Sequence, residues 1–216
     1  MENKTLIEVK NLSKVFNKVS VIDELSVNFN QGDRIALIGQ NGAGKTTLIR
    51  CILGLYTYEG YLSVLDKNPR NEREKMLLDV GFVPQLPPPL KMTVAEIIEF
   101  FSVLTKTDLE RFYQIASELK LNVKEHLNKP FLKLSGGMKQ KLLVSLALSR
   151  NPKILLMDEP SANLDPEARE VLFKYLKELP QDTLMILSSH RVDEIEDLVN
   201  RLIEMDLGKI VVDKAV

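Results

Sequence analysis

The sequence predicts an α/β fold with a mainly parallel sheet, N-terminal antiparallel β strands and an inserted helical lobe. Short, continuous apolar runs such as "RIALIG", "KILLMDEP" and "TLMILSSH" suit strands that are buried on both faces. Segments with helical spacing, such as "KTTLIRCILGL", alternate with these runs. Strands that alternate with helices in this way indicate an α/β core built on parallel strands.

The first two strands are predicted from a different pattern. "TLIEVKNLSKVF" and "SVIDELSVNFN" alternate apolar and polar residues, which is typical of strands with one buried face. "DVGFVPQ" is a further candidate for a buried strand. We therefore expect antiparallel strands to precede the parallel part of the sheet.

The helical lobe is predicted from a change of pattern between residues 86 and 149. "TVAEIIEFFSVL", "DLERFYQIASEL" and the stretch from Met138 have helical periodicity, with no strand pattern between them. Three prolines at 87–89 favour extended backbone where the lobe begins. The 216 residues thus fit one domain, with an α/β core of residues 1–85 and 150–216 and a lobe of residues 86–149.

Composition restricts the class of protein. The chain is 44% hydrophobic and 27% charged, as globular domains are, and its net charge of −1 gives no electrostatic footprint for nucleic acid. Cys51, the single cysteine, excludes a disulfide within the chain and fits a reducing compartment as a small core residue. No apolar run approaches the roughly 18 residues of a membrane span. We expect a cytoplasmic chain that serves a membrane only through a partner.

A phosphate-binding loop is predicted at residues 39–46. "GQNGAGKT" matches G-x-x-x-x-G-K-[ST] between a predicted strand and a predicted helix, the context that such a P-loop requires. Its glycines allow backbone N–H groups to converge on phosphate oxygens, and the helix dipole is aimed at the same anion. We expect Lys45 to reach the β- and γ-phosphates, Thr46 to bind Mg²⁺ and Thr47 to donate to the α-phosphate. The predicted nucleotide-binding residues of this stretch are Gly39, Gln40, Asn41, Gly42, Ala43, Gly44, Lys45, Thr46 and Thr47. The alternative is a glycine-rich turn that only caps a helix.

The acidic pair Asp158–Glu159 follows the buried run "ILLM". A parallel sheet presents ligands at the carboxyl ends of its strands, so Asp158 is predicted to hold Mg²⁺ there. Glu159, one residue later, is predicted to orient the attacking water and accept its proton. Taken alone, the pair could also be an acidic helix cap before Pro160. Together with the P-loop it predicts a Mg²⁺-dependent nucleoside triphosphatase.

The motifs resemble one family, the nucleotide-binding domains of ATP-binding cassette (ABC) proteins. The resemblance covers about residues 6–212 and has the family's motifs in order: Phe16, "GQNGAGKTT", Gln85 of "VPQ", "LSGGM", "LLMDEP", "SANLD" and His190 of "SSH". "LSGG" followed by "DEP" and a histidine is much more specific than a P-loop alone. The resemblance implies ATP and Mg²⁺ as cofactors and a single nucleotide-binding domain that hydrolyses ATP.

The resemblance also implies a head-to-tail dimer. In it, the P-loop of one copy and the Ser135, Gly136 and Gly137 stretch of the other hold the same ATP. Ser135 can cap the following helix and offer its hydroxyl to the γ-phosphate, while glycines let backbone N–H groups approach closely. A plain Ser-Gly-Gly loop before a helix is the alternative. Met138 stands where the family commonly has the glutamine that ends this motif. We expect this difference to affect the control of the hydrolysis rate more than ATP binding.

Four further roles follow from the resemblance. Phe16 would stack on adenine, although it could be a packed residue at a strand end. Gln85 would sense Mg²⁺ and the γ-phosphate, and His190 would hydrogen-bond the γ-phosphate and hold the attacking water. Asp165 would lie at the dimer seam, but it could equally cap a helix before Pro166. His126 is expected on the surface of the lobe.

The predicted function is the ATPase subunit of an ABC transporter, peripheral on the cytoplasmic face of the membrane. Its partners would be a second nucleotide-binding domain, in a homodimer, and a separate integral membrane permease of the export type. Its cargo stays open between drug or lipid export and metalloenzyme maturation. The alternative is an ABC ATPase that acts on ribosomes or DNA, and a small-molecule kinase has no use for "LSGG". Only 90 positions separate Lys45 from Ser135, which leaves no room for the long coiled coils of repair proteins.

Overall fold

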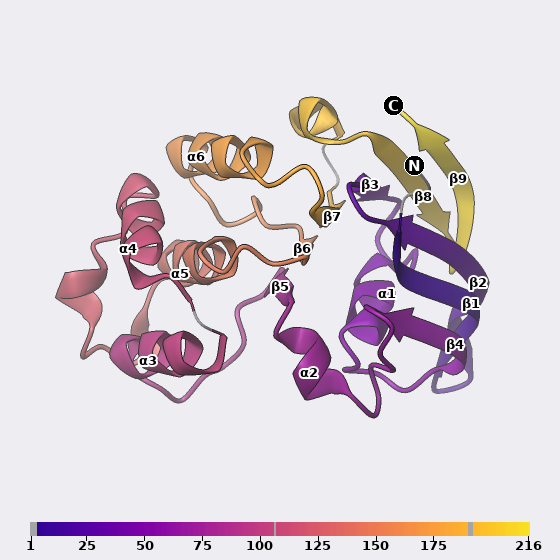
Figure 1. Ribbon diagram of the computed structural model, residues 1–216, viewed down its shortest axis with the longest axis horizontal. Coiled ribbons are helices and arrows are strands. Elements are labelled where there is room, and N and C mark those ends of the chain that lie inside the picture. Colours follow the sequence, from indigo (N-terminus) through magenta and orange to yellow (C-terminus); the bar gives the residue numbers. More distant parts are fainter. Residues whose placement is uncertain (1–3, 106, 190–191) are drawn as a thin grey trace. The chain divides into compact units, whose positions relative to one another are not determined.

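The computed structural model describes residues 4–105, 107–189 and 192–216, and the chain divides into two compact units (Figure 1). The sheet unit consists of the residues up to Val80, Lys153–Asp158, and the residues from Gln181 onward. The helical unit consists of Gly81–Pro152 and Glu159–Pro180. Residues 159–180, which the sequence pattern assigned to the α/β core, therefore group with the helices.

An antiparallel sheet of three strands in the order β2-β1-β4 begins the sheet unit. Its strands are β1 (Thr5–Phe16), β2 (Val19–Asn30) and β4 (Glu59–Val64). A two-residue turn joins β1 to β2, and both its residues, Asn17 and Lys18, have positive φ, as the tightest hairpin turns require. One face of each strand is buried, which confirms the half-buried N-terminal strands predicted from alternation.

The second sheet is mainly parallel. Within the sheet unit its strand order is β6-β7-β3-β8-β9. Pairing is parallel from β6 to β8, and the final pair, β8 with β9, is antiparallel. These strands are β3 (Arg34–Ile38), β6 (Ile154–Asp158), β7 (Leu184–Ser188), β8 (Arg201–Asp206) and β9 (Lys209–Ala215). Every residue of β6 and β7 is buried, as the continuous apolar runs predicted.

Helices of the sheet unit are short. They are α1 (Lys45–Ile52), α2 (Arg73–Leu77) and the single turns η3 (Val192–Glu194) and η4 (Glu196–Leu198). Helix α1 starts inside the glycine-rich loop and buries Cys51 completely. Burial raises the pKa of the Cys51 thiol to about 11, so this cysteine is a small core residue. Strand β5 (Val80–Val83) begins at the last residue of the sheet unit.

The helical unit is built from α3 (Val94–Thr105), α4 (Leu109–Glu118), α5 (Gly136–Leu148) and α6 (Pro166–Lys177). Two single turns, η1 (Val123–His126) and η2 (Phe131–Lys133), lie between α4 and α5. Phe112 and Phe131 are fully buried in an apolar cluster to which α3, α4 and α5 contribute. Asp108 and Asp165 cap α4 and α6, each by accepting a hydrogen bond from a backbone N–H three residues on.

A membrane-spanning helix would need about 18 or more residues of high hydropathy. None of the helices in the described ranges meets that requirement.

Candidate functional site

The glycine-rich loop between β3 and α1 has a backbone that only glycine adopts easily. Gly39, Gly42 and Gly44 have φ of 139°, 88° and 106°. A Cβ at Gly39 would overlap the backbone oxygen of Met205, and one at Gly44 would lie 2.8 Å from the backbone oxygen of Val21. Two of the three glycines are thus required by space as well as by φ.

Lys45, the first residue of α1, directs its ammonium back over the loop. Lys45 Nζ donates to the backbone oxygens of Gly39, at 2.5 Å, and Gln40, at 3.1 Å. The middle of the loop is exposed at Gln40, Asn41 and Gly42, whereas Ala43 is buried. No acidic residue lies in the first turn of α1, so the lysine and the positive end of the helix dipole act together on an anion.

Thr46, Asp158 and Ser188 form a hydrogen-bonded oxygen cluster in the sheet unit. Thr46 Oγ1 donates to Asp158 Oδ2 at 2.8 Å, and Ser188 Oγ donates to Asp158 Oδ1 at 2.6 Å. Asp158 is only 3% exposed at the carboxyl end of β6, and Ser188 ends the neighbouring strand β7. Hydroxyl and carboxylate oxygens are the ligands that Mg²⁺ prefers, so Thr46 and Asp158 fit that ion. Thr47, the residue after Thr46, is half-buried.

The contact of Ser188 was missed by sequence reasoning. Ser188 lies in the "SSH" motif, which was singled out only for its histidine. The signal available was its position at the end of a fully buried strand that runs parallel to the Asp158 strand.

Gln85 and Glu159 lie side by side in the helical unit. Gln85 Nε2 donates to Glu159 Oε2 at 3.2 Å, and the backbone oxygen of Gln85 accepts from Asn163 Nδ2 at 3.4 Å. Glu159 has a φ of 48°, which is uncommon for a residue with a side chain and frequent at functional positions. The structure thus brings together two side chains for which related roles were predicted from separate motifs.

The "LSGG" motif forms the start of α5. Ser135 is the N-cap, and its Oγ accepts a hydrogen bond from the backbone N–H of Met138 at 3.2 Å. Gly136 is exposed, and within the described ranges a Cβ built on it would meet no atom within 4 Å beyond its chain neighbours and the adjacent backbone of α5. A Cβ on Gly137 would lie 3.1 Å from the backbone oxygen of Asn163. Packing inside the chain therefore explains glycine at 137 but does not explain it at 136.

Met138, which replaces the glutamine common in this motif, packs inside the helical unit. Its partly buried side chain contacts the apolar cluster of the helical unit. A thioether suits this position because it fills apolar space flexibly.

Phe16, at the end of β1, is 36% exposed and belongs to a small aromatic and cationic group. Its ring makes an edge-to-face contact with Tyr56, at 5.2 Å between centroids, and Lys14 Nζ lies 4.6 Å from its centre. Arg50 of α1 donates to the Tyr56 hydroxyl at 2.6 Å. Sequence reasoning did not indicate Lys14, Arg50 or Tyr56, which lack a motif.

Asp165 has the structural role that was one of its two alternatives. It caps α6 by accepting from the backbone N–H of Ala168 at 2.9 Å, and it pairs with Lys141 Nζ at 2.6 Å. The hydrogen bond from Lys141, followed by that from Ala168, lowers the pKa of the Asp165 carboxyl. His190 lies outside the described residues.

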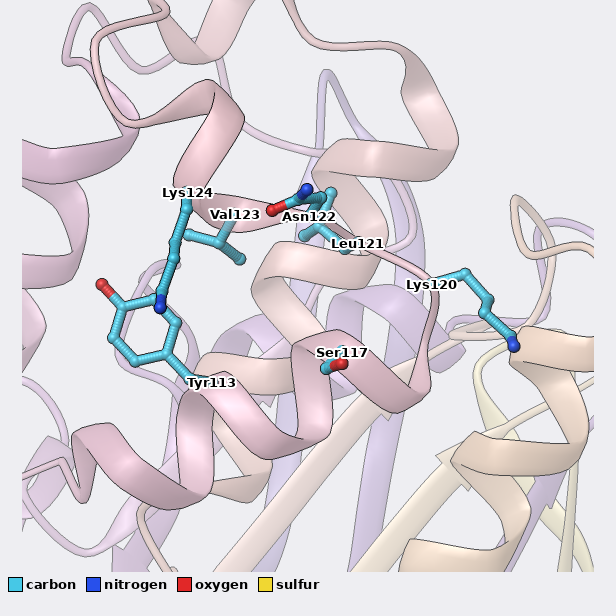
Figure 2. A pocket seen from close by; sticks show the side chains of 7 residues that line it. All are labelled: Tyr113, Ser117, Lys120, Leu121, Asn122, Val123 and Lys124. Carbon is cyan, nitrogen blue, oxygen red and sulfur yellow. The ribbon is translucent and has the colours of Figure 1, made fainter.

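A separate open pocket of about 540 Å³ lies on the helical unit, where α4 meets the segment that follows it (Figure 2). Lys120 and Lys124 contribute to its wall, and in Figure 2 their ammonium groups point in different directions. None of the predicted site residues lines it.

Comparison with known proteins identifies the family of the chain. A family model described as "ABC transporter" matches residues 22–162, more than half of the chain. The methionine import ATP-binding protein MetN of Clostridioides difficile (strain 630) is 30% identical over 95% of this chain and 67% of its own length. The glutamine transport ATP-binding protein GlnQ of Escherichia coli (strain K12) is 32% identical over 96% of this chain and 90% of its own length.

Solved structures are similar over the whole described fold. An ATP-binding subunit of an ABC transporter has a TM-score of 0.85 at 25% identity, over 98% of this chain and 90% of that chain. A dimeric post-hydrolysis state of the ATP-binding cassette MJ0796, bound to ADP and Pi, has a TM-score of 0.83 at 22% identity, over 97% and 98%. This second likeness supports the fold, which confirms the predicted α/β class. The chain therefore belongs to the ABC transporter family and is the ATP-binding, ATP-hydrolysing subunit of an ABC transporter.

Proposed function

We propose that two copies of this chain associate head to tail around two Mg-ATP molecules and thereby move a separate membrane permease. In each composite site, the loop of residues 39–47 holds the phosphates of ATP. Ser135, Gly136 and Gly137 of the other copy complete the site. The exposed start of α5 is the observation that carries this proposal, because Gly136 is open to an outside ligand and packing within the chain gives no reason for it.

The phosphates are bound by charge and by backbone N–H groups. Lys45 supplies a cation whose position is already fixed by two backbone oxygens. The start of α1 and the start of α5 each add the attraction of a helix dipole, about 0.3–1 kcal/mol. Phe16, partly exposed beside Tyr56, stacks on the adenine ring.

Thr46 and Asp158 are the proposed protein ligands of Mg²⁺, with Gln85 as a third oxygen donor. When bound, the ion neutralises charge on the phosphate oxygens. Ser188 holds the Asp158 carboxylate in orientation through its hydroxyl. Glu159 is the proposed general base for the attacking water, and Gln85 holds its carboxylate by a hydrogen bond. His190 is proposed to hydrogen-bond the γ-phosphate.

Hydrolysis does mechanical work because it removes contacts from the dimer seam. To shift a dimer from 1:99 to 99:1 in favour of closure, ATP must prefer the closed form by about 5.5 kcal/mol. Two triphosphates, each held by several charge-assisted hydrogen bonds, are of the right order for that. Loss of the γ-phosphate withdraws the bonds that reach Ser135 and its neighbours.

The proposed permease docks on the surface around Gln85 to Thr93, where Leu86 is 75% exposed. This contact would hold the chain at the cytoplasmic face of the membrane. The relatives differ in direction of transport, since their names include methionine import and Nod factor export. The proposal therefore concerns the ATP-driven step and names no cargo.

The test is the association state of a hydrolysis-deficient variant. Glu159→Gln removes the proposed base, so the variant should bind Mg-ATP, hydrolyse it very slowly and accumulate as a dimer in size-exclusion chromatography with light scattering. The same variant carrying Lys45→Ala should stay monomeric, because it no longer holds the phosphates. Solitary particles of Glu159→Gln at saturating Mg-ATP, or normal turnover by it, contradict the proposal.

A further inference from the structure

Gln140 is a fully buried amide on α5 that bonds to two other loops of the helical unit. Its Nε2 donates to the backbone oxygen of Pro160 at 3.2 Å and to that of Pro84 at 3.4 Å. Both partners are carbonyl oxygens, which only accept, so the amide nitrogen must be the group that faces them. One side chain thus joins two segments that lie 56 and 20 positions away from it in the sequence.

These two carbonyls flank the Gln85 and Glu159 side chains. Pro84 immediately precedes Gln85, and Pro160 immediately follows Glu159. Gln85 and Glu159 are themselves bonded side chain to side chain at 3.2 Å. Gln140 therefore closes a ring of covalent and hydrogen bonds that passes through both residues, and a shift of either loop would stretch or break one of the hydrogen bonds in this ring.

The cost of this arrangement indicates that it does more than fill space. Gln140 Oε1 is buried and has no hydrogen-bond partner within the described part of the chain. Leaving a buried acceptor unpaired costs about 1–3 kcal/mol, which an apolar side chain of similar size would avoid. The residues after Lys141 in α5, from Leu142 to Val144, are buried apolar side chains. A buried amide at 140 therefore carries a cost in stability that an apolar side chain would not.

We propose that Gln140 is a positioning residue for ATP hydrolysis, which holds the backbone on either side of the Gln85–Glu159 pair. Gln140 lies one helical turn after Gly136, so the helix that begins at the "LSGG" motif also sets the position of the Glu159 carboxylate. Through Gln140, a phosphate that contacts the start of α5 would influence the position of the Glu159 carboxylate, the proposed general base. The inference depends on the proposed role of Glu159 as general base.

The decisive variants remove the amide donor and keep the length of the side chain. Gln140→Met supplies no donor, and Gln140→Glu presents a carboxylate to the two carbonyl oxygens. In steady-state ATPase assays of the full chain with Mg-ATP, each should lower kcat about ten- to a hundredfold, since a misplacement of about 1 Å costs that much. KM and the Kd for ATP should stay within about twofold of the wild type, because the loop of residues 39–47 is untouched.

Ser145→Ala is the matched control on the same helix. The Ser145 hydroxyl is also buried, but it donates to the backbone oxygen of Lys141 within α5, and the described residues show no bond from it to another segment. Its removal should leave kcat at the wild-type value. Thermal melting of all variants separates positioning from stability, and Gln140→Met is decisive if Gln140→Glu fails to fold.

Different results would contradict the positioning role of Gln140 and the role of Glu159 as general base. Wild-type kcat in Gln140→Met, or a loss of activity that follows KM or melting temperature alone, overturns the role of Gln140. If Glu159→Gln is inactive in the same assay while Gln140→Met is fully active, only the positioning role is lost. If Glu159→Gln hydrolyses ATP normally, the proposed base itself is wrong.

Discussion

Thr46 donates its hydroxyl hydrogen to Asp158 at 2.8 Å, across 112 positions of sequence. The other oxygen of the same carboxylate accepts from Ser188 at 2.6 Å. Two hydroxyls, one from the P-loop helix and one from the neighbouring strand, thus fix a carboxylate that is almost completely buried. The orientation of Asp158 is therefore a property of the tertiary fold.

Replacement of Asp158 and replacement of its hydrogen-bond donor Ser188 should reduce Mg²⁺-dependent ATPase activity to different extents. Asp158→Asn removes a proposed ligand charge and should nearly abolish Mg²⁺-dependent hydrolysis. Ser188→Ala leaves the carboxylate in place but held by Thr46 alone, and should weaken the apparent affinity for Mg²⁺ about tenfold, as loss of such supporting contacts does. A titration of ATPase activity with Mg²⁺ at fixed ATP measures both. Unchanged half-saturation in both variants is the contrary result.

Gly136→Ala should separate folding from association. Apart from its chain neighbours and the adjacent backbone of α5, no atom of the described residues lies within 4 Å of the added Cβ. Alanine also favours helix over glycine, so the melting temperature should stay constant or rise slightly. In a Glu159→Gln background, the ATP-dependent dimer should nevertheless weaken about tenfold, or 1.4 kcal/mol, because a methyl group now meets the ligand of the other copy. Sedimentation of the two variants at several concentrations gives the comparison. An equally tight dimer would place the ligand elsewhere.

Phe16→Ala should weaken binding of the base and leave binding of the phosphates intact. Loss of base stacking costs about 1–3 kcal/mol, so the Kd for ATP should rise at least about fivefold. Phe16→Trp retains a stacking surface and should bind ATP close to normally. Inhibition of ATPase activity by tripolyphosphate, which has no base, should be the same in all three proteins. A Phe16→Ala variant with wild-type ATP affinity would leave Phe16 as a packed residue at a strand end.

The Lys141–Asp165 pair should make stability depend on acidity. The pKa of Asp165 is lowered in the folded chain, so its contribution is present above the ordinary carboxyl value of 3.8 and is lost as pH falls through the lower folded value. Asp165→Asn should therefore be less stable than the wild type at pH 7, with a difference that shrinks below pH 3.8. Urea unfolding at several pH values tests this, with exposed Glu170→Gln as control. A difference that does not change with pH contradicts the assignment.

Local patterns predicted most of the elements because their causes are local. Continuous apolar runs marked β3, β6 and β7, and alternation marked β1 and β2. Serine and aspartate before helical spacing marked the caps of α5 and α6, since those side chains accept from backbone N–H groups three residues on. The grouping of α6 with the helical unit was not visible, because periodicity shows that a helix is amphipathic and leaves its packing partner open.

By itself, the sequence determined the chemistry of this protein. A glycine-rich loop ending in Lys45 and Thr46, an acidic pair after a buried strand and the "LSGG" motif name the groups that a triphosphate needs, because each motif depends on residue type and spacing. Only the tertiary structure decided which distant groups meet. The Thr46–Asp158–Ser188 cluster and the Gln85–Glu159–Gln140 ring join segments far apart in the chain, and such contacts arise from strand order and helix packing, which no local pattern encodes.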